Sequence, residues 1–354
     1  MGASNSQLLL ERWDGARWRI QPAPVPPAAQ FSELNGVSCT ATSCIAVGDY
    51  VNSSGLDATL AERWNGTRWS IQPTPNPAGV PTAVLFGVSC TSGSSCMAVG
   101  TTFNNSGQAG LFSERWNGAT WHLQAVPAPS GAQSSLLLNV SCAASSCEAV
   151  GEYNDSSGAT VTLGERWDGS TWHAQSTPNP ARASGNSLSG VSCPSPLDCT
   201  AVGLGNGSGT PITLGERWNG TGWSLEAVPS PVGAAENQLN GIACPATDAC
   251  AAVGIVFPTR GAISAEALGW NGRTWRLQKT PVVPGANLNW VSCVSENDCV
   301  AVGASNAGTL AERWNGKDWT IQATPPPDRR AAASPVWRAR RLRSVWRSAA
   351  VRPG

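Results

Sequence analysis

The stretch Glu62-Arg63-Trp64-Asn65-Gly66-Thr67-Arg68-Trp69 decides the fold, because it recurs with small changes along the chain. Each copy places one tryptophan before an Asn-Gly or Asp-Gly turn and a second tryptophan five residues later. The copies follow one another at steps of 44 to 52 residues, and periods near fifty are typical of blades, solenoid turns or arrays. The seven pairs are Trp13/Trp18, Trp64/Trp69, Trp116/Trp121, Trp167/Trp172, Trp218/Trp223, Trp270/Trp275 and Trp314/Trp319.

One repeat unit predicts four short antiparallel strands. Leu34 to Cys39 and Cys44 to Gly48 form a hairpin, Ala58 to Trp64 is the third strand, and Trp69 to Gln72 is the fourth. The Asn-Gly turn between the last two strands favours positive φ, and the prolines that follow prevent further ladder pairing. Four-stranded units of this length suit the blades of a β-propeller, whereas the coils of a β-helix, the main alternative, are much shorter.

The predicted fold is therefore all-β: a β-propeller with six complete blades and an N-terminal half blade from Leu8 to Gln21. Counting strands shows that this half blade lacks one inner hairpin. Because propellers often close by joining strands from both termini in one blade, we expect a ring that is seven-bladed by design. A six-bladed ring with a loose N-terminal half blade is the alternative.

All twelve cysteines fall at one place in the repeat, as six close pairs. Local disulfides are the preferred interpretation, because each unit supplies only two thiols and no recurrent histidine completes a zinc shell. Disulfides imply an oxidising compartment, so we expect a secreted or cell-surface protein, although this chain carries no recognisable signal peptide. The pairs are Cys39/Cys44, Cys90/Cys96, Cys142/Cys147, Cys193/Cys199, Cys244/Cys250 and Cys293/Cys299.

The composition argues against two classes of partner, nucleic acid and the membrane interior. Charged residues make up 13% of the chain and the formal net charge is zero, so the body lacks the field that would attract nucleic acid. The sequence contains no apolar run long enough for a transmembrane helix. We expect a monomer without a cofactor.

The turn Trp167-Asp168-Gly169-Ser170-Thr171-Trp172 is similar in position and spacing to the S-x-D-x-G-x-x-W signature of Asp-box (BNR) propellers. The chain departs from that signature, because the acid or Asn directly precedes Gly and the leading Ser is replaced. Over residues 7 to about 325 the chain also resembles an actinobacterial-type repeat family of unknown function, with V-S-C…C-x-A-V-G and E-R-W-N-G motifs. This second resemblance implies an exported propeller and supplies no active residues.

The C-terminal 27 residues differ from the rest. Residues 1–327 read as one propeller domain with repeats of about 51 residues, whereas residues 328–354 form a basic tail with eight arginines. If the arginines use CGN codons, the same nucleotides can be read in a frame moved two nucleotides forward. That frame allows the peptide Leu-Ser-Gly-Val-Ala-Cys, which ends across the codons of Arg338 and Ala339. It also allows Cys-Val-Ala-Val-Gly, which begins across the codons of Ser344 and Val345. We therefore interpret the tail as a non-native, frameshifted remnant of the seventh blade. A basic arm for anionic surfaces is the functional alternative.

Most residues that could act in catalysis or binding recur at the same position in several repeats, which favours a structural role for them. His122 and His173 both follow the second tryptophan of a pair, where other repeats hold varied polar residues, so a solvated position is predicted. The recurring Glu-Arg pairs are expected to be structural, either solvated or bridging between blades, and one repeat replaces the pair with Leu268-Gly269. We therefore predict no catalytic, cofactor-binding or metal-binding residue. We interpret the loop acids as solvated charges, with a cluster at one face of the ring as the alternative. They are Asp49, Glu152, Asp155 and Glu296.

The segments after each A-V-G differ from one another while the strands repeat, and recognition can be built on such loops. We expect a binding module that presents these loops to an unknown protein or glycan ligand from one rim. A glycan hydrolase or lyase at the channel mouth is the enzyme alternative, and a purely structural or adhesive array is a third. The loops are residues 49–56, 101–109, 152–160, 204–211, 255–262 and 304–308.

Overall fold

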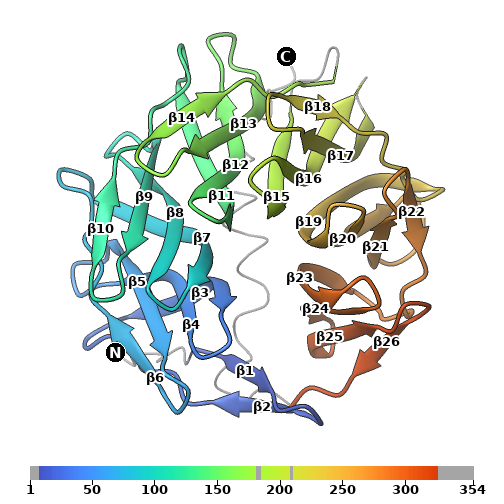
Figure 1. Ribbon diagram of the computed structural model, residues 1–354, viewed down its shortest axis with the longest axis horizontal. Helices are drawn as coiled ribbons and strands as arrows, with labels where there is room; N and C mark the ends of the chain where they lie inside the picture. The colour runs from blue at the N-terminus through green and yellow to red at the C-terminus, as the bar shows by residue number, and fades with distance from the viewer. Residues whose placement is uncertain (1–7, 181–184, 208–209, 326–354) are drawn as a thin grey trace.

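The computed structural model describes residues 8–180, 185–207 and 210–325. In this part of the chain every regular element is a β-strand, and the strands form six four-stranded antiparallel sheets and one two-stranded sheet. The six sheets are blades around a ring, with the first strand of each blade nearest the centre (Figure 1). The expected all-β propeller of four-stranded blades is therefore confirmed.

The strands follow the repeat closely. The two-stranded sheet, called the half blade, comprises β1 (Leu10–Trp13) and β2 (Trp18–Gln21). Blade 1 is β3 (Phe31–Cys39), β4 (Cys44–Val51), β5 (Asp57–Trp64) and β6 (Trp69–Gln72); blade 2 is β7 (Thr82–Ser92), β8 (Ser95–Phe103), β9 (Ala109–Trp116) and β10 (Trp121–Gln124). Blade 3 is β11 (Ser134–Ala143), β12 (Ser146–Asn154), β13 (Thr160–Trp167) and β14 (Trp172–Gln175); blade 4 is β15 (Ser187–Ser195), β16 (Asp198–Gly207), β17 (Thr210–Trp218) and β18 (Trp223–Leu225). Blade 5 is β19 (Ala234–Ala246), β20 (Ala249–Pro258), β21 (Ser264–Trp270) and β22 (Trp275–Gln278); blade 6 is β23 (Asn287–Ser295), β24 (Asp298–Ser305), β25 (Gly308–Trp314) and β26 (Trp319–Gln322).

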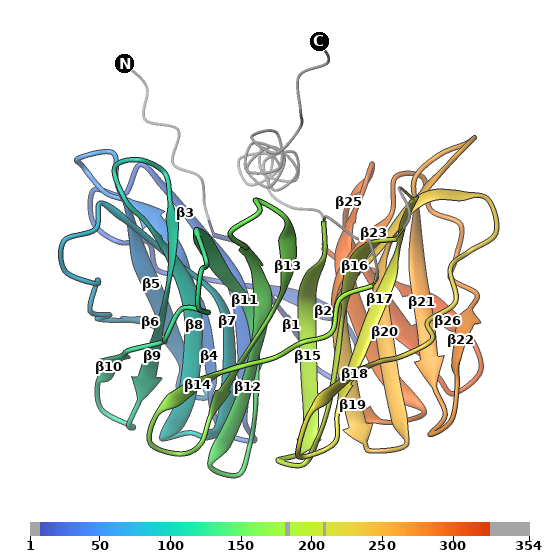
Figure 2. The same ribbon diagram turned by 90° about the horizontal axis from the view of Figure 1, so that it is seen from above.

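Strand register separates two rims of the ring, which Figure 2 shows from the side. In blade 1, Cys39 pairs with Cys44, Cys44 with Trp64, and Trp64 with Trp69, so all four lie at one end of the sheet. We call this end the disulfide rim. The connections from second to third strand, and from each blade to the next, lie at the other end, which we call the loop rim. The prediction that the loops after A-V-G share one rim follows directly from this register.

The hydrophobic core lies between the blades rather than inside any one sheet. Five buried clusters each span two consecutive blades, from blades 1 and 2 to blades 5 and 6. The side chains alternate across each strand, so both faces of a complete blade are apolar and each face packs against a neighbour. A leucine of the first strand is completely buried in this way in five blades: Leu85, Leu137, Leu188, Leu239 and Leu288.

Glycine permits the closest backbone approaches. A Cβ at Gly48 would lie 2.0 Å from the carbonyl oxygen of Glu33 on the paired strand, beside a register shift between Leu34 and Gly36. A Cβ at Gly36 would lie 2.8 Å from the carbonyl oxygen of Phe86 in the next blade. The glycine of the A-V-G motif is therefore required by the bulged inner hairpin, and Gly36 permits the close approach of the inner strands of blades 1 and 2.

The half blade lies in the ring between blade 6 and blade 1 (Figure 1). Its sheet has two strands, so the structure shows six complete blades, and a seventh complete blade is not present among the described residues. The tail predicted at 328–354 lies outside the described residues.

Candidate functional site

The disulfide rim carries six disulfides, one in each complete blade. Each joins the end of the first strand to the start of the second across five or six residues. They are Cys39–Cys44, Cys90–Cys96, Cys142–Cys147, Cys193–Cys199, Cys244–Cys250 and Cys293–Cys299, the pairs that the spacing predicts. Such small rings constrain a strand end locally, and six of them are typical of a secreted protein.

Five of the six glutamates of the Glu-Arg pairs are buried, which corrects the expectation that they could be solvated; the sixth, Glu11 of the half blade, is partly buried. Glu62, Glu114, Glu165, Glu216 and Glu312 are all 0% exposed in the interfaces between sheets. Desolvation raises the pKa of Glu114 and Glu165 to about 8, and that of Glu62 to about 7. At pH 7 the carboxyls of Glu114 and Glu165 therefore favour the protonated form, and that of Glu62 is about half protonated.

The arginines of the same pairs bridge consecutive blades. In four of the six pairs the guanidinium lies over the first tryptophan of the next blade, at 5.3 to 5.9 Å from the ring centroid, a cation–π distance. The four pairs are Arg12 over Trp64, Arg115 over Trp167, Arg166 over Trp218, and Arg217 over Trp270.

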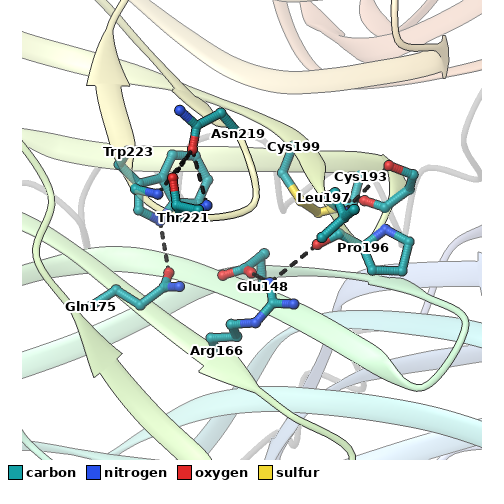
Figure 3. Close-up of polar contacts among 12 residues, drawn as sticks. Glu148, Arg166, Gln175, Cys193, Pro196, Leu197, Cys199, Asn219, Thr221 and Trp223 are labelled. Carbon is teal, nitrogen blue, oxygen red and sulfur yellow. Dashed lines mark hydrogen bonds and ion pairs between the residues drawn. A yellow bond between two sulfur atoms is a disulfide. The ribbon is translucent and has the colours of Figure 1, made fainter.

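Figure 3 shows one such interface in detail, between blades 3 and 4. The Arg166 guanidinium donates to the carboxylate of Glu148 in its own blade and, at 3.2 Å, to the carbonyl oxygen of Pro196 in the next. The indole Nε1 of Trp223 donates back to the side-chain oxygen of Gln175 at 2.7 Å. The Glu-Arg and Trp motifs thus join neighbouring blades, which confirms the bridging interpretation for the arginines.

Blade 5, which has Leu268-Gly269 in place of the Glu-Arg pair, borders a pocket. Gly269 stands where the other blades have arginine, and a cavity of about 230 Å³ lies between blades 5 and 6 at the disulfide rim. Trp270 and Trp314 line it together with Asp248 and Glu296. The sequence shows that the repeat is broken at Gly269, but it does not predict a pocket. The missing arginine belongs to blade 5, whereas the indole that it would cover, Trp314, belongs to blade 6.

Both histidines lie at exposed positions, as predicted. His173 Nε2 is 2.9 Å from the Oδ2 of Asp168, whose pKa is held well below its usual range by backbone and side-chain hydrogen bonds from the turn. His122 Nε2 contacts the side chains of Asn117 and Thr120. These contacts are local to the turn between the two tryptophans of each pair.

The four loop acids do not form the cluster considered as an alternative, and Asp49 and Glu152 are not solvated loop charges either. Asp49 and Glu152 belong to strands β4 and β12 rather than to loops, and Asp49 is completely buried. Burial raises the pKa of Glu152, partly offset by a hydrogen bond from Ser187. Asp155 lies in an exposed turn of the loop rim, whereas Glu296 lies at the disulfide rim. The described residues contain no group of three His, Cys, Asp or Glu side chains that could hold a metal ion.

The loop rim instead presents preorganised turns. In the connections after β4, β8 and β12, the Oδ1 of Asn52, Asn104 or Asp155 accepts hydrogen bonds from the backbone N–H groups two and four residues later. The backbone shape of the three turns is therefore shared. Their sequences are also similar, and the clearest difference at an exposed position is the last residue of the turn, which is Leu56 in the first and Gln108 in the second.

Comparisons with known proteins support the fold. No family model matches the chain, and no curated protein matches its sequence. Among solved structures, Trypanosoma rangeli sialidase is similar with a TM-score of 0.55 and 11% identity, over 98% of this chain and 60% of that chain. The protein YjhT has a TM-score of 0.52 and 12% identity over 84% of this chain and 99% of that one. Hadza microbial sialidase Hz136 has a TM-score of 0.51 and 13% identity over 91% and 74%.

These likenesses show that the chain shares the propeller architecture. At identities of 11 to 13%, they extend to the fold alone. In addition, no helix among the described residues is long and apolar enough to cross a membrane.

Proposed function

We propose that this chain is an extracellular or cell-surface binding module that recognises a protein or glycan ligand through its loop rim. The observation that carries this proposal is a set of loop-rim turns that share one hydrogen-bonded backbone and present a different residue, Leu56 or Gln108, at the same exposed position. The disulfide rim repeats the same Trp, Arg and Cys contacts from blade to blade, so its side chains are used in holding the ring together. Turns held by their own Asx hydrogen bonds lose little conformational entropy on binding.

The experiment screens the exported, oxidised protein against a glycan array and a panel of cell-surface ectodomains. Leu56→Arg and Gln108→Arg change two exposed loop-rim positions, and we expect each to weaken binding of a hit at least tenfold. Arg273→Glu, in an exposed turn of the disulfide rim, is the matched control and should leave binding unchanged. Loss of binding in the control with retention in both loop-rim variants would refute the proposal.

A glycan hydrolase or lyase is the second candidate. It is favoured by the raised pKa of Glu152 near the loop rim and by the sialidases among the proteins of similar architecture. Release of 4-methylumbelliferone from a panel of fluorogenic glycosides tests it, with Glu152→Gln as the variant. Activity that survives Glu152→Gln unchanged would remove this residue from consideration as the acid.

We also propose that residues 1–327 form a single propeller domain, monomeric and seven-bladed by design, with 328–354 as a non-native remnant of the seventh blade. The support is the position of the half blade in the ring and its contact with blade 1, where Arg12 lies over Trp64 as its counterparts do elsewhere. Sequencing the corresponding gene tests the remnant, and a clean frame through residues 328–354 would contradict it.

A further inference from the structure

One face of blade 1 is uncovered at positions that are buried in other blades. Val37 is 60% exposed, although the valine or isoleucine at the same position is at most 9% exposed in the next four blades. Leu34 is only partly buried, whereas its five counterparts are completely buried. Both side chains face the half blade, which has no inner strands to cover them. The four buried counterparts of Val37 are Val88, Val140, Val191 and Ile242.

The facing surface of blade 6 is uncovered in the same way. Val302 is partly exposed, whereas the valine three residues after the second cysteine is 0% exposed in each of the other five blades. Val300 is also only partly buried, and it lines a cavity of about 200 Å³ together with Trp13 and Trp18 of the half blade. We call the space between these two uncovered faces, beside β1, the groove; the cavity is its blade 6 side. The five buried valines are Val47, Val99, Val150, Val202 and Val253.

Hydrogen-bonding groups at the groove match those used between complete blades. In four interfaces the serine of the V-S-C motif accepts a hydrogen bond from the backbone N–H of the first cysteine in the next blade, at 2.9 to 3.0 Å. Ser292 of blade 6 is the same serine, and it is exposed at the wall of the cavity. The four bonds are Cys90 to Ser38, Cys142 to Ser89, Cys193 to Ser141, and Cys244 to Ser192.

The half blade offers a sheet edge to the same space. In every complete blade the third strand pairs with the second, with the first Trp opposite the second Cys. β1 is the equivalent of a third strand, and among the described residues it pairs only with β2. Such an edge is a template for another strand.

We infer that this groove is the seat of a β-hairpin of the repeat's own kind, which adds two strands to β1 and completes a seventh blade. The hairpin carries the pattern L-x-G-V-x-C…C-x-A-V-G. Its second strand pairs with β1 so that its second Cys lies opposite Trp13, and its first Cys N–H donates to Ser292. Its apolar residues cover Val37 and Leu34 on one side and Val302 on the other. This inference rests on the seven-bladed frame proposed above, and not on the ligand of the loop rim.

We assign the hairpin to the same gene. It is encoded by the nucleotides that follow the codon of Pro325 when they are translated in a frame moved two nucleotides forward. That frame permits Leu-Ser-Gly-Val-Ala-Cys, five further residues, and Cys-Val-Ala-Val-Gly. The implied separation of six between the cysteines equals that of Cys193–Cys199. The structure adds an independent reason for this reading, because the uncovered positions of blades 1 and 6 are those that such a hairpin would bury.

The test uses the chain as written, exported and oxidised, and a synthetic disulfide-closed peptide copying Ser187–Leu204. Calorimetry should give one peptide per chain, and the melting temperature should rise by about 4 °C at a hundredfold excess over Kd. A peptide with Gly203→Leu is the matched control, because a Cβ at Gly203 would lie 2.0 Å from the carbonyl oxygen of Ser187 and prevent the hairpin. A wild-type peptide that fails to bind, or a control peptide that binds equally, would overturn the inference.

Protein variants locate the binding site. Val37→Glu should fold normally, because Val37 is already exposed, and should lose peptide binding at least tenfold. Val232→Glu changes a fully exposed valine away from the groove and should bind like the wild type. If the free protein is a dimer that Val37→Glu dissociates, a second copy fills the groove and the inference is wrong.

A frame-restored chain identifies the source. It should melt at a higher temperature than the chain as written and should no longer bind the peptide. Unchanged peptide binding by the restored chain would refute the assignment of the hairpin to that frame. Leu56→Arg at the loop rim should leave peptide binding intact, so failure of the ligand proposal and failure of this inference are distinguishable.

Discussion

The buried glutamates make the stability of the ring depend on pH in an unusual direction. Glu114 is 0% exposed, and burial raises its pKa from 4.5 to about 8. An acid whose pKa is higher in the folded state binds its proton more tightly there. Its contribution to stability is therefore fully present below pH 4.5 and is lost as pH rises through about 8. Since Glu62, Glu165 and Glu312 are shifted the same way, the protein should be more stable at pH 5 than at pH 9.

The perturbation that isolates one carboxyl is Glu114→Gln. A shift from 4.5 to about 8 corresponds to roughly 5 kcal/mol if it is fully expressed. Relaxation and water entry reduce such values, so we expect Glu114→Gln to raise the free energy of unfolding by about 2 to 4 kcal/mol at pH 9 relative to wild type. At pH 5 the difference should fall below about 1 kcal/mol, because the wild-type carboxyl is then largely protonated.

Urea denaturation of both proteins from pH 5 to pH 9, with the disulfides intact, measures this difference. Glu296→Gln is the control, because Glu296 is exposed, and it should change the free energy of unfolding by less than about 0.5 kcal/mol. If wild-type stability stays level or rises between pH 5 and pH 9, the buried carboxyls are not carrying protons and the reasoning is wrong.

Three further predictions concern the frame. Gly269→Arg should stabilise the protein by about 1 kcal/mol in thermal melts, because it places a guanidinium over Trp314. The Gln278 side chain lies 2.5 Å from the position of the new Cβ and has to move first. A lower melting temperature would show that the pocket cannot accept the arginine. Replacing Cys142 and Cys147 together by serine should cost about 2 kcal/mol in urea denaturation, the effect of closing a very small ring, and an unchanged midpoint would contradict this. Gly169→Ala should cost about 1 to 2 kcal/mol because φ is +105° there, whereas Gly222→Ala, with open space around it, should stay within about 0.5 kcal/mol; equal melting temperatures would refute the argument from φ.

The local structure of this protein could be predicted from the sequence because its signals are short-range. The fourth strand of blade 1 was expected at Trp69–Gln72 and is found there, since an Asn-Gly turn on one side and prolines on the other bound it. The third strand differs from expectation by one residue, beginning at Asp57. Cysteine pairs five or six residues apart at the ends of a hairpin allow one local partner each, so their pairing also followed from spacing.

What the tertiary structure decided is how neighbouring blades meet. Strand alternation assigns a side chain to a face, but it does not say whether water or another sheet lies against that face. For this reason Glu62 and its counterparts are buried rather than solvated, and Glu296 and Asp155 lie on opposite rims. The pocket at Gly269 has the same origin, because a residue lost from one blade uncovers a tryptophan of the next, and only the packed ring brings the two together.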